Sequence, residues 1–149
     1  PFAKGGLRRG AALAEGAIIL SVLLMLILGT LDLGLGTYQY NTLSQAAREG
    51  ARKAAVHGAL ANATNGVWGP TTYSGTADDG SVYAQAVSGM LVGFTLTNVT
   101  ITVEWIDGSN TVGKRVRYTV SNTYTPAVAS YFANSSYTQT AVSTMPIAH

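Results

Sequence analysis

The clearest chemical demand in the chain comes from Glu15, a carboxylate within a long apolar run. The stretch from Arg8 to Gly34 reads RRGAALAEGAIILSVLLMLILGTLDLG. A carboxylate in an apolar helix costs a few kcal/mol to insert into a membrane, unless it lies at the interface or meets a cation. Two interpretations follow. Glu15 pairs with a cation of a neighbouring helix, or it lies at the level of the lipid headgroups beside Arg8 and Arg9.

Asp32 and the glycines around it are further candidates for contacts between helices. Asp32 lies near the far end of the run, where it either serves assembly or marks the point at which a helix leaves the membrane. Glycine allows helices to approach closely, although it costs up to about 1 kcal/mol of helix stability against alanine. This combination predicts a helix that packs among copies of itself. The candidate assembly residues are Glu15, Arg8, Arg9, Gly29, Asp32 and Gly34.

No other pattern in the sequence predicts a catalytic, cofactor-binding or metal site. The segment ADDG, residues 77–80, lacks the further ligands and the closing Glu of a calcium loop. His57 and His149 have no cluster of carboxylates or cysteines beside them. No GxSxG or comparable nucleophile motif occurs. We therefore expect no enzyme, no cofactor and no metal.

The composition gives only general information about the partners of the protein. The 149 residues contain no cysteine, and only 11% are charged, with a formal net charge of +2. The basic residues form no dense stretch, so we expect no nucleic-acid partner. Asn62, Asn98 and Asn134 each begin an Asn-x-Ser/Thr triplet, a possible glycosylation site in a host that glycosylates asparagine.

The element that carries Glu15 is predicted to be a membrane-length helix. Residues 11–35 would span about 37 Å as a helix, against a hydrocarbon core of about 30 Å. The basic residues before them predict that this end stays cytoplasmic. A cleaved secretory signal normally has a shorter apolar core and a small-x-small site. A plain transmembrane anchor is the other alternative.

Helical spacing continues beyond the apolar run to Gly58, a predicted C-cap. Leu43, Ala47, Gly50 or Ala51, and Ala54 recur at steps of three or four, which predicts one buried face. Glu49 and Lys53 are four residues apart, a spacing that favours an ion pair. The two parts together predict a single helix of roughly 70 Å over residues 11–58.

The remaining residues predict a small α+β domain. Residues 59–79 are rich in turn-forming residues and predict a loop with at most short strands. A second helix is expected over residues 80–92, capped by Asp78 or Asp79. Its expected apolar face contains Val82, Ala86, Val87 and Met90.

Three segments have the alternation or composition of strands, namely 98–106, 112–125 and 137–145. The tetrapeptide DGSN between the first two predicts a hairpin turn. The expected fold class is therefore α+β, with a long N-terminal hydrophobic helix, a short second helix and a small antiparallel sheet of three or four strands. The expected divisions are a basic leader or extension (1–10), a transmembrane and assembly helix (11–58) and a globular domain (59–149).

The N-terminal third resembles the TadE/TadG-like proteins of tight-adherence (Flp-type) pili, which are type IV pilin-like. The residues that carry this resemblance are Gly10, Glu15, Asp32, Asn41 and the segment AAREGAR, Ala46–Arg52. The resemblance is strong over about the first 58 residues and weak in the C-terminal strands.

The resemblance implies a processing site. A prepilin peptidase would cut after Gly10 and free the amine of Ala11, and Glu15 would neutralise such an amine on its own chain or on a neighbour. Alternatively, residues 1–10 remain in the mature subunit, with Arg8 or Arg9 as the natural partner of Glu15.

The resemblance also implies a function. The chain would be a structural subunit of an extracellular filament for adhesion or surface attachment, and its partners would be copies of itself and the pilus assembly machinery. It would lie in the inner membrane before assembly and on the cell surface afterwards. The alternative is a membrane-anchored extracellular binding module, or a minor pilin that is not the main building block.

Overall fold

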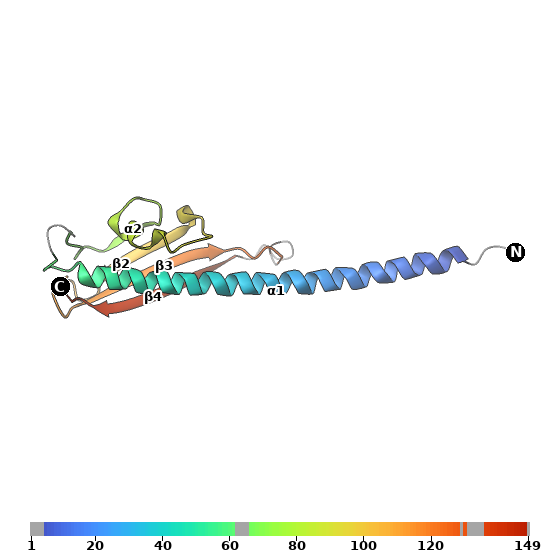
Figure 1. Ribbon diagram of the computed structural model, residues 1–149, viewed down its shortest axis with the longest axis horizontal. Helices are drawn as coiled ribbons and strands as arrows, with labels where there is room; N and C mark the ends of the chain where they lie inside the picture. Colours follow the sequence, from blue (N-terminus) through green and yellow to red (C-terminus); the bar gives the residue numbers. More distant parts are fainter. Residues whose placement is uncertain (1–4, 62–65, 129, 131–135, 149) are drawn as a thin grey trace.

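One long helix and a four-stranded sheet make up most of the structure. The computed structural model describes residues 5–61, 66–128, 130 and 136–148, with side chains from residue 10 onward. Helix α1 (Gly5–Val56) contains 52 residues. Its C-terminal part lies along the sheet, and its N-terminal part projects beyond it (Figure 1). The single helix expected from the sequence is confirmed; it begins at Gly5, inside the segment 1–10, and ends two residues before Gly58.

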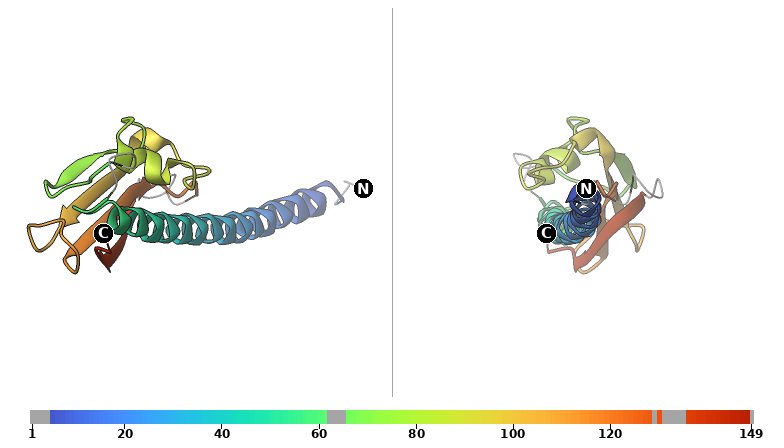
Figure 2. Two further views of the ribbon diagram at one scale, coloured as in Figure 1. Left: turned by 60° about the vertical axis from the view of Figure 1, so that its left-hand side comes forward. Right: turned by 90° about the vertical axis from the view of Figure 1, so that its right-hand side faces the viewer.

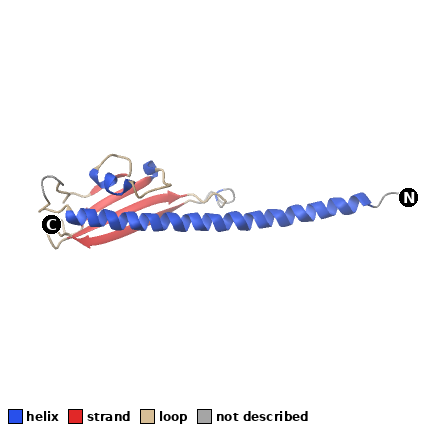
Figure 3. Ribbon diagram, in the orientation of Figure 1, coloured by secondary structure: helices blue, strands red, loops and turns tan. Residues whose placement is uncertain are grey.

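The sheet is antiparallel throughout and has the strand order β1-β2-β3-β4. Its strands are β1 (Tyr73–Thr76), β2 (Val99–Trp105), β3 (Arg115–Tyr124) and β4 (Tyr137–Pro146). Helix α2 (Val82–Ser88) and the 3-10 turn η1 (Leu96–Asn98) lie between β1 and β2. This arrangement confirms the α+β fold class, and Figure 3 shows helix α1 running beside the strands.

The core lies between the sheet and α1. Alternate residues of β2 and β3 are buried, as expected for strands with one face toward a core. The facing side of α1 buries Leu43, Ala47, Ala51 and Ala54 completely, which confirms the predicted face. Because most of these helix residues are alanines, the helix axis can lie close to the strands. Figure 2 shows this layer from two further sides.

The boundaries of the second helix were predicted wrongly. The helix begins after Gly80, whose φ of +74° lies in the left-handed region and ends any helical path there. Ser81, rather than an aspartate, is the N-cap, and its side chain accepts a hydrogen bond from the Ala84 backbone N–H. Asp79 instead accepts from the Ser81 backbone N–H. Aspartate therefore shapes the turn before the helix.

The predicted apolar face of that helix was half right. Ala86 and Val87 are buried, together with Ala84. Val82 is 53% exposed and Met90 is 37% exposed. The helix ends at Ser88, so Met90 lies beyond it.

Candidate functional site: the exposed stem and its junction with the head

The most unusual surface of the molecule is the free part of α1. We call residues 10–31 of α1 the stem and the described residues from Asp32 onward the head. The large apolar side chains from Leu13 to Leu31 are 46 to 76% exposed. Within the described residues, α1 is long and apolar enough to cross a membrane, and none of its most apolar window is buried. At 1.5 Å per residue the stem spans about 33 Å, close to the hydrocarbon thickness of about 30 Å.

The hydroxyl groups of the stem are satisfied within the helix. Ser21 Oγ donates to the Ala17 carbonyl at 2.8 Å, and Thr30 Oγ1 donates to the Ile27 carbonyl at 2.8 Å. Such bonds to the preceding turn leave no unpaired hydroxyl donor facing lipid. The stem therefore presents an apolar surface despite its Ser and Thr residues.

The predicted assembly residues are distributed along α1, within the stem and just beyond its two ends. Glu15 is exposed. Among the side chains that the structure describes, from residue 10 onward, none forms an ion pair with it. The side chains of Arg8 and Arg9 lie outside this range. A side chain added at Gly29 or Gly34 would meet nothing within 4 Å. Gly10 lies inside helix α1. These residues are thus open to contact with another molecule.

Asp32 has a structural role that the sequence did not predict. It is only 9% exposed, and its carboxylate accepts hydrogen bonds from the backbone N–H groups of Ala127 (3.0 Å) and Val128 (2.7 Å). Tyr124 Oη donates to the Asp32 carbonyl at 3.0 Å. Hydrogen bonds to a carboxylate are about twice as strong as neutral ones. Asp32 therefore ties the segment after β3 to the helix at the junction of stem and head.

A second set of polar contacts continues from the junction into the head. Gln139 Nε2 donates to the Gly36 carbonyl at 3.0 Å, and Asn122 Nδ2 donates to Gln39 Oε1 at 3.3 Å. Asn122 and Gln139 face each other across β3 and β4, and both are buried. The end of the helix–sheet interface nearest the stem is therefore polar, whereas the end near the C-terminus of α1 is apolar.

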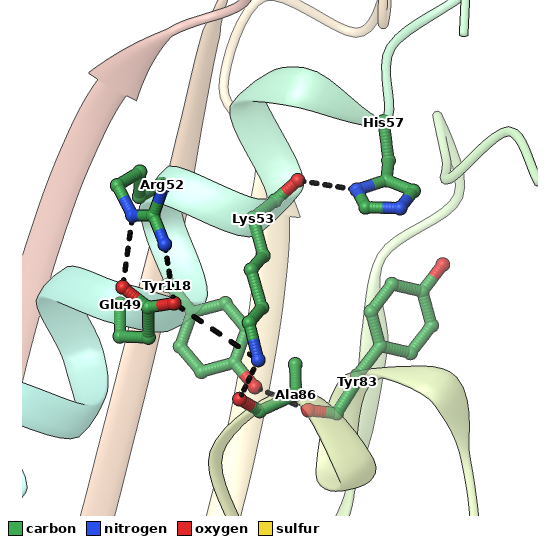
Figure 4. Close-up of polar contacts among 7 residues, drawn as sticks. All are labelled: Glu49, Arg52, Lys53, His57, Tyr83, Ala86 and Tyr118. Carbon is green, nitrogen blue, oxygen red and sulfur yellow. Dashed lines mark hydrogen bonds and ion pairs between the residues drawn. The ribbon is translucent and has the colours of Figure 1, made fainter. Parts of the chain in front are cut away.

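The AAREGAR segment packs the helix tightly onto β3. Tyr118 is fully buried, and a Cβ added to Gly50 would lie 2.5 Å from its ring. The Tyr118 hydroxyl donates to the Tyr83 carbonyl at 2.6 Å (Figure 4). Burial raises the pKa of Tyr118 well above its usual range, so this hydroxyl keeps its proton. Gly50 leaves the space that this ring occupies.

Charged residues of this segment, together with Lys53 just after it, form a network of polar contacts. Arg52 donates two hydrogen bonds to Glu49, at 2.9 and 2.7 Å, which hold the pKa of Glu49 below its usual value. Lys53 lies 4.0 Å from Glu49, the predicted pair, and donates to the Ala86 carbonyl at 2.7 Å. Lys53 thus links α1 to helix α2, as Figure 4 shows.

The remaining candidates from the sequence are the two histidines and the three Asn-x-Ser/Thr triplets. The His57 ring stacks on Trp68 with a centroid distance of 4.5 Å, and its Nδ1 lies 2.6 Å from the Lys53 carbonyl. In the described ranges, no cluster of three His, Cys, Asp or Glu side chains could hold a metal ion. Asn98 is exposed beside β2. Asn62, Asn134 and His149 lie outside the described residues.

These features define an α+β protein whose N-terminal helix is suited to membrane anchoring. Residues 10–52 match the family model of TadE-like proteins. The match confirms the resemblance inferred from the sequence: the chain carries a TadE-like domain, which comprises the stem, the junction at Asp32 and the AAREGAR segment. This domain indicates involvement in the Tad pilus system. No curated protein and no solved structure matches the chain.

Proposed function

We propose that this chain is a structural subunit of an extracellular Tad-type filament, in which the stems are bundled at the centre and the heads lie outside. The observation that carries the proposal is the stem itself, a membrane-length helix that is apolar on all sides and held rigidly to a packed head. The TadE-like match over residues 10–52 supports the same assignment. The filament would serve adhesion or surface attachment.

The apolar surface of the stem favours two successive environments, first the membrane and then a bundle of helices. Burying one large aliphatic side chain stabilises by roughly 1.5–3 kcal/mol, so the exposed stem must enter lipid or a helix bundle. Lipid is as apolar as a leucine surface, so bundling depends on close packing and on polar contacts. Gly29 and Gly34 can supply the close packing, and Glu15 can supply a polar contact. Before assembly the chain would lie in the membrane, where a prepilin peptidase and the assembly machinery would act on it.

A fractionation experiment tests this proposal. Cells that express the native chain are sheared, and the sheared material and the membranes are probed with an antibody against the head. A filament subunit appears in the sheared fraction as a polymer. A membrane-anchored binding module stays with the membranes, and a minor pilin appears in the sheared fraction in small amounts beside another main subunit.

A further inference from the structure

The connection that follows β3 lies alongside the stem, on the N-terminal side of its attachment to Asp32. A hollow of about 280 Å³ separates the two segments there. Met25 and Gly29 of the stem form one wall, and Pro126 and Val128 of the connection form another. Figure 1 shows this connection extending from the end of β3 along α1 toward the N-terminus. The head therefore overlaps the membrane-length part of the helix.

The length of α1 places this hollow within the hydrocarbon of a membrane. With Gly10 at one boundary, a hydrocarbon thickness of about 30 Å ends at about residue 30, since a helix rises about 1.5 Å per residue. Met25 and Gly29 lie on the hydrocarbon side of that second boundary. The walls that they share with the connection are therefore at the depth of lipid acyl chains.

Tyr137 lies where an interfacial tyrosine would lie. It lines the same hollow and is 48% exposed. Its hydroxyl lies 3.0 Å from a Cβ added at Gly36, which is about 9 Å beyond the hydrocarbon boundary. The ring thus borders the hydrocarbon and the hydroxyl reaches the headgroups, an arrangement for which tyrosine is enriched at membrane surfaces.

The backbone of the connection is hydrogen-bonded as contact with lipid requires. In hydrocarbon, each backbone N–H or C=O group without a partner costs several kcal/mol. The Asp32 carboxylate accepts from the N–H groups of Ala127 and Val128, and Pro126 has no N–H group. The Ser130 N–H donates to the Pro126 carbonyl at 3.1 Å, and the Ser130 hydroxyl donates to the Ala127 carbonyl at 3.0 Å. Every N–H group from Pro126 to Val128 is thus accounted for outside any helix or strand.

The segments around the hollow carry few charges. Residues 33–47 and 118–148 contain no Asp, Glu, Lys or Arg. Arg115 and Arg117 lie at the opposite end of β3, where Arg115 is level with Pro146 of β4. The end of the sheet nearest the stem can therefore approach a membrane without burying a charged side chain of β3 or β4.

We propose that the hollow binds an acyl chain of a membrane lipid, from the leaflet on the side of the head, and that the connection after β3 is immersed in that leaflet. This inference rests on the membrane stage of the proposed function and adds to it a contact made by the head. An acyl chain suits the hollow better than a lipid headgroup does. Among the described residues that line the hollow, none is cationic, and the carboxylate of Asp32 would repel a phosphate.

Photochemical labelling of the full-length chain tests this proposal. The chain is reconstituted at a high ratio of lipid to protein in phosphatidylcholine vesicles, in which a fraction of the acyl chains carries a diazirine. After irradiation, lipid adducts are mapped by mass spectrometry in the stem, at residues 125–128 and at residues 106–114, between β2 and β3. Gly29→Phe places a ring in the hollow. The matched control, Gly16→Phe, makes the same change at an open position of the stem away from the hollow.

The expected result is labelling of the stem and of residues 125–128, with at least several-fold less label at residues 106–114. Gly29→Phe should lower the label at residues 125–128 several-fold relative to the stem, and Gly16→Phe should not. Three results would overturn the lipid site and leave the membrane stage intact: a labelled stem without label at residues 125–128, label there that Gly29→Phe does not reduce, or an equal reduction by both variants. Absence of label from the stem would overturn both.

Discussion

At the scale of single residues, the proposed function gives Glu15 a role only in the assembly, because a carboxylate in an apolar helix is costly in the free chain. Gly50 is the reverse, because its benefit is realised inside one molecule through the ring of Tyr118. The two residues belong to the same matched segment, 10–52, but they call for different measurements. The first needs an assay of assembly, and the second needs an assay of folding.

Replacement of Glu15 by alanine should permit membrane insertion but impair incorporation into filaments. Removal of a carboxylate makes insertion easier by up to a few kcal/mol. In a bundle it leaves a neighbouring cation buried without its partner, which typically costs about 3–5 kcal/mol. Glu15→Gln should be intermediate. The amounts of subunit in membranes and in sheared filaments decide the matter, and normal assembly of Glu15→Ala would identify Glu15 as a simple interfacial residue.

Replacement of Gly50 by alanine should destabilise the head by about 1–3 kcal/mol, because the added methyl group overlaps the buried ring of Tyr118. The matched control is Gly34→Ala, where the methyl group meets nothing within 4 Å. That change should be neutral or stabilise the helix by up to about 1 kcal/mol. Denaturant unfolding in detergent, followed by tryptophan fluorescence, measures both. Equal free energies of unfolding for the two variants would show that the Tyr118 ring can accommodate a methyl group at position 50.

At the scale of the elements, the junction and the hairpin of β2 and β3 are each held by one carboxylate. Asp32 joins α1 to the segment after β3. Asp107, in the connection between β2 and β3, accepts hydrogen bonds from the backbone N–H and the side chain of Arg115. Asp32 joins two elements that lie far apart in the sequence, and Asp107 stabilises the connection in which the chain reverses between two strands.

Replacement of Asp32 by alanine should loosen the segment after β3 without unfolding the sheet. Two partly buried backbone N–H groups lose their acceptor, and a hydrogen bond to a charged group contributes about 1.5–3 kcal/mol. Amide hydrogen exchange at Ala127 and Val128 should accelerate strongly, while exchange in β3 changes little. Asp32→Asn keeps one acceptor oxygen and should show a smaller effect. Unchanged exchange at both amides would contradict the role assigned to Asp32.

The pair of Asp107 and Arg115 predicts a dependence of stability on acid. The hydrogen bond from the Arg115 side chain lowers the pKa of Asp107 from its ordinary value of 3.8 to about 2. A lowered folded-state pKa contributes stability above the unfolded value, and that contribution is lost as pH falls from about 4 toward 2. Asp107→Asn should therefore reduce the loss of stability over this range. Unfolding curves of both forms between pH 5 and pH 2, at about one-unit steps, compare the slopes.

At the scale of the whole molecule, the stem and the head have opposite requirements. The head buries its apolar residues within itself, whereas the stem exposes nearly all of its own. One continuous helix joins them, so any partner of the stem positions the head. This rigid connection is what would transmit the packing of a central bundle to an outer surface.

Removal of residues 1–31 should convert the protein into a monomer that is soluble without detergent. The intact chain should require detergent or remain in a large assembly, because a helix that is apolar all round cannot be left in water. Size-exclusion chromatography coupled to light scattering distinguishes the states. A soluble monomeric intact chain would contradict the proposed assembly.

The amino-acid sequence by itself determined the long helix, three of the four strands and the family resemblance; it did not place β1 (Tyr73–Thr76) within the loop expected over residues 59–79. Spacing of Leu43, Ala47 and Ala54 identified the buried helix face, and alternation in residues 98–106 identified a strand, because both periodicities are local properties of the backbone. The cap of α2 was misassigned, since two aspartates, a glycine and a serine stand side by side and only the φ of Gly80 separates their roles.

Only the tertiary structure decided the roles of Asp32 and Gly50. Asp32 bonds to residues 95 and 96 positions later in the chain, and no local pattern encodes such a separation. Gly50 stood on the predicted face, but the ring that requires it belongs to β3. The stem is apolar on every side, so its sequence cannot distinguish one face from another. In the head that distinction arises because the sheet covers one side of the same helix.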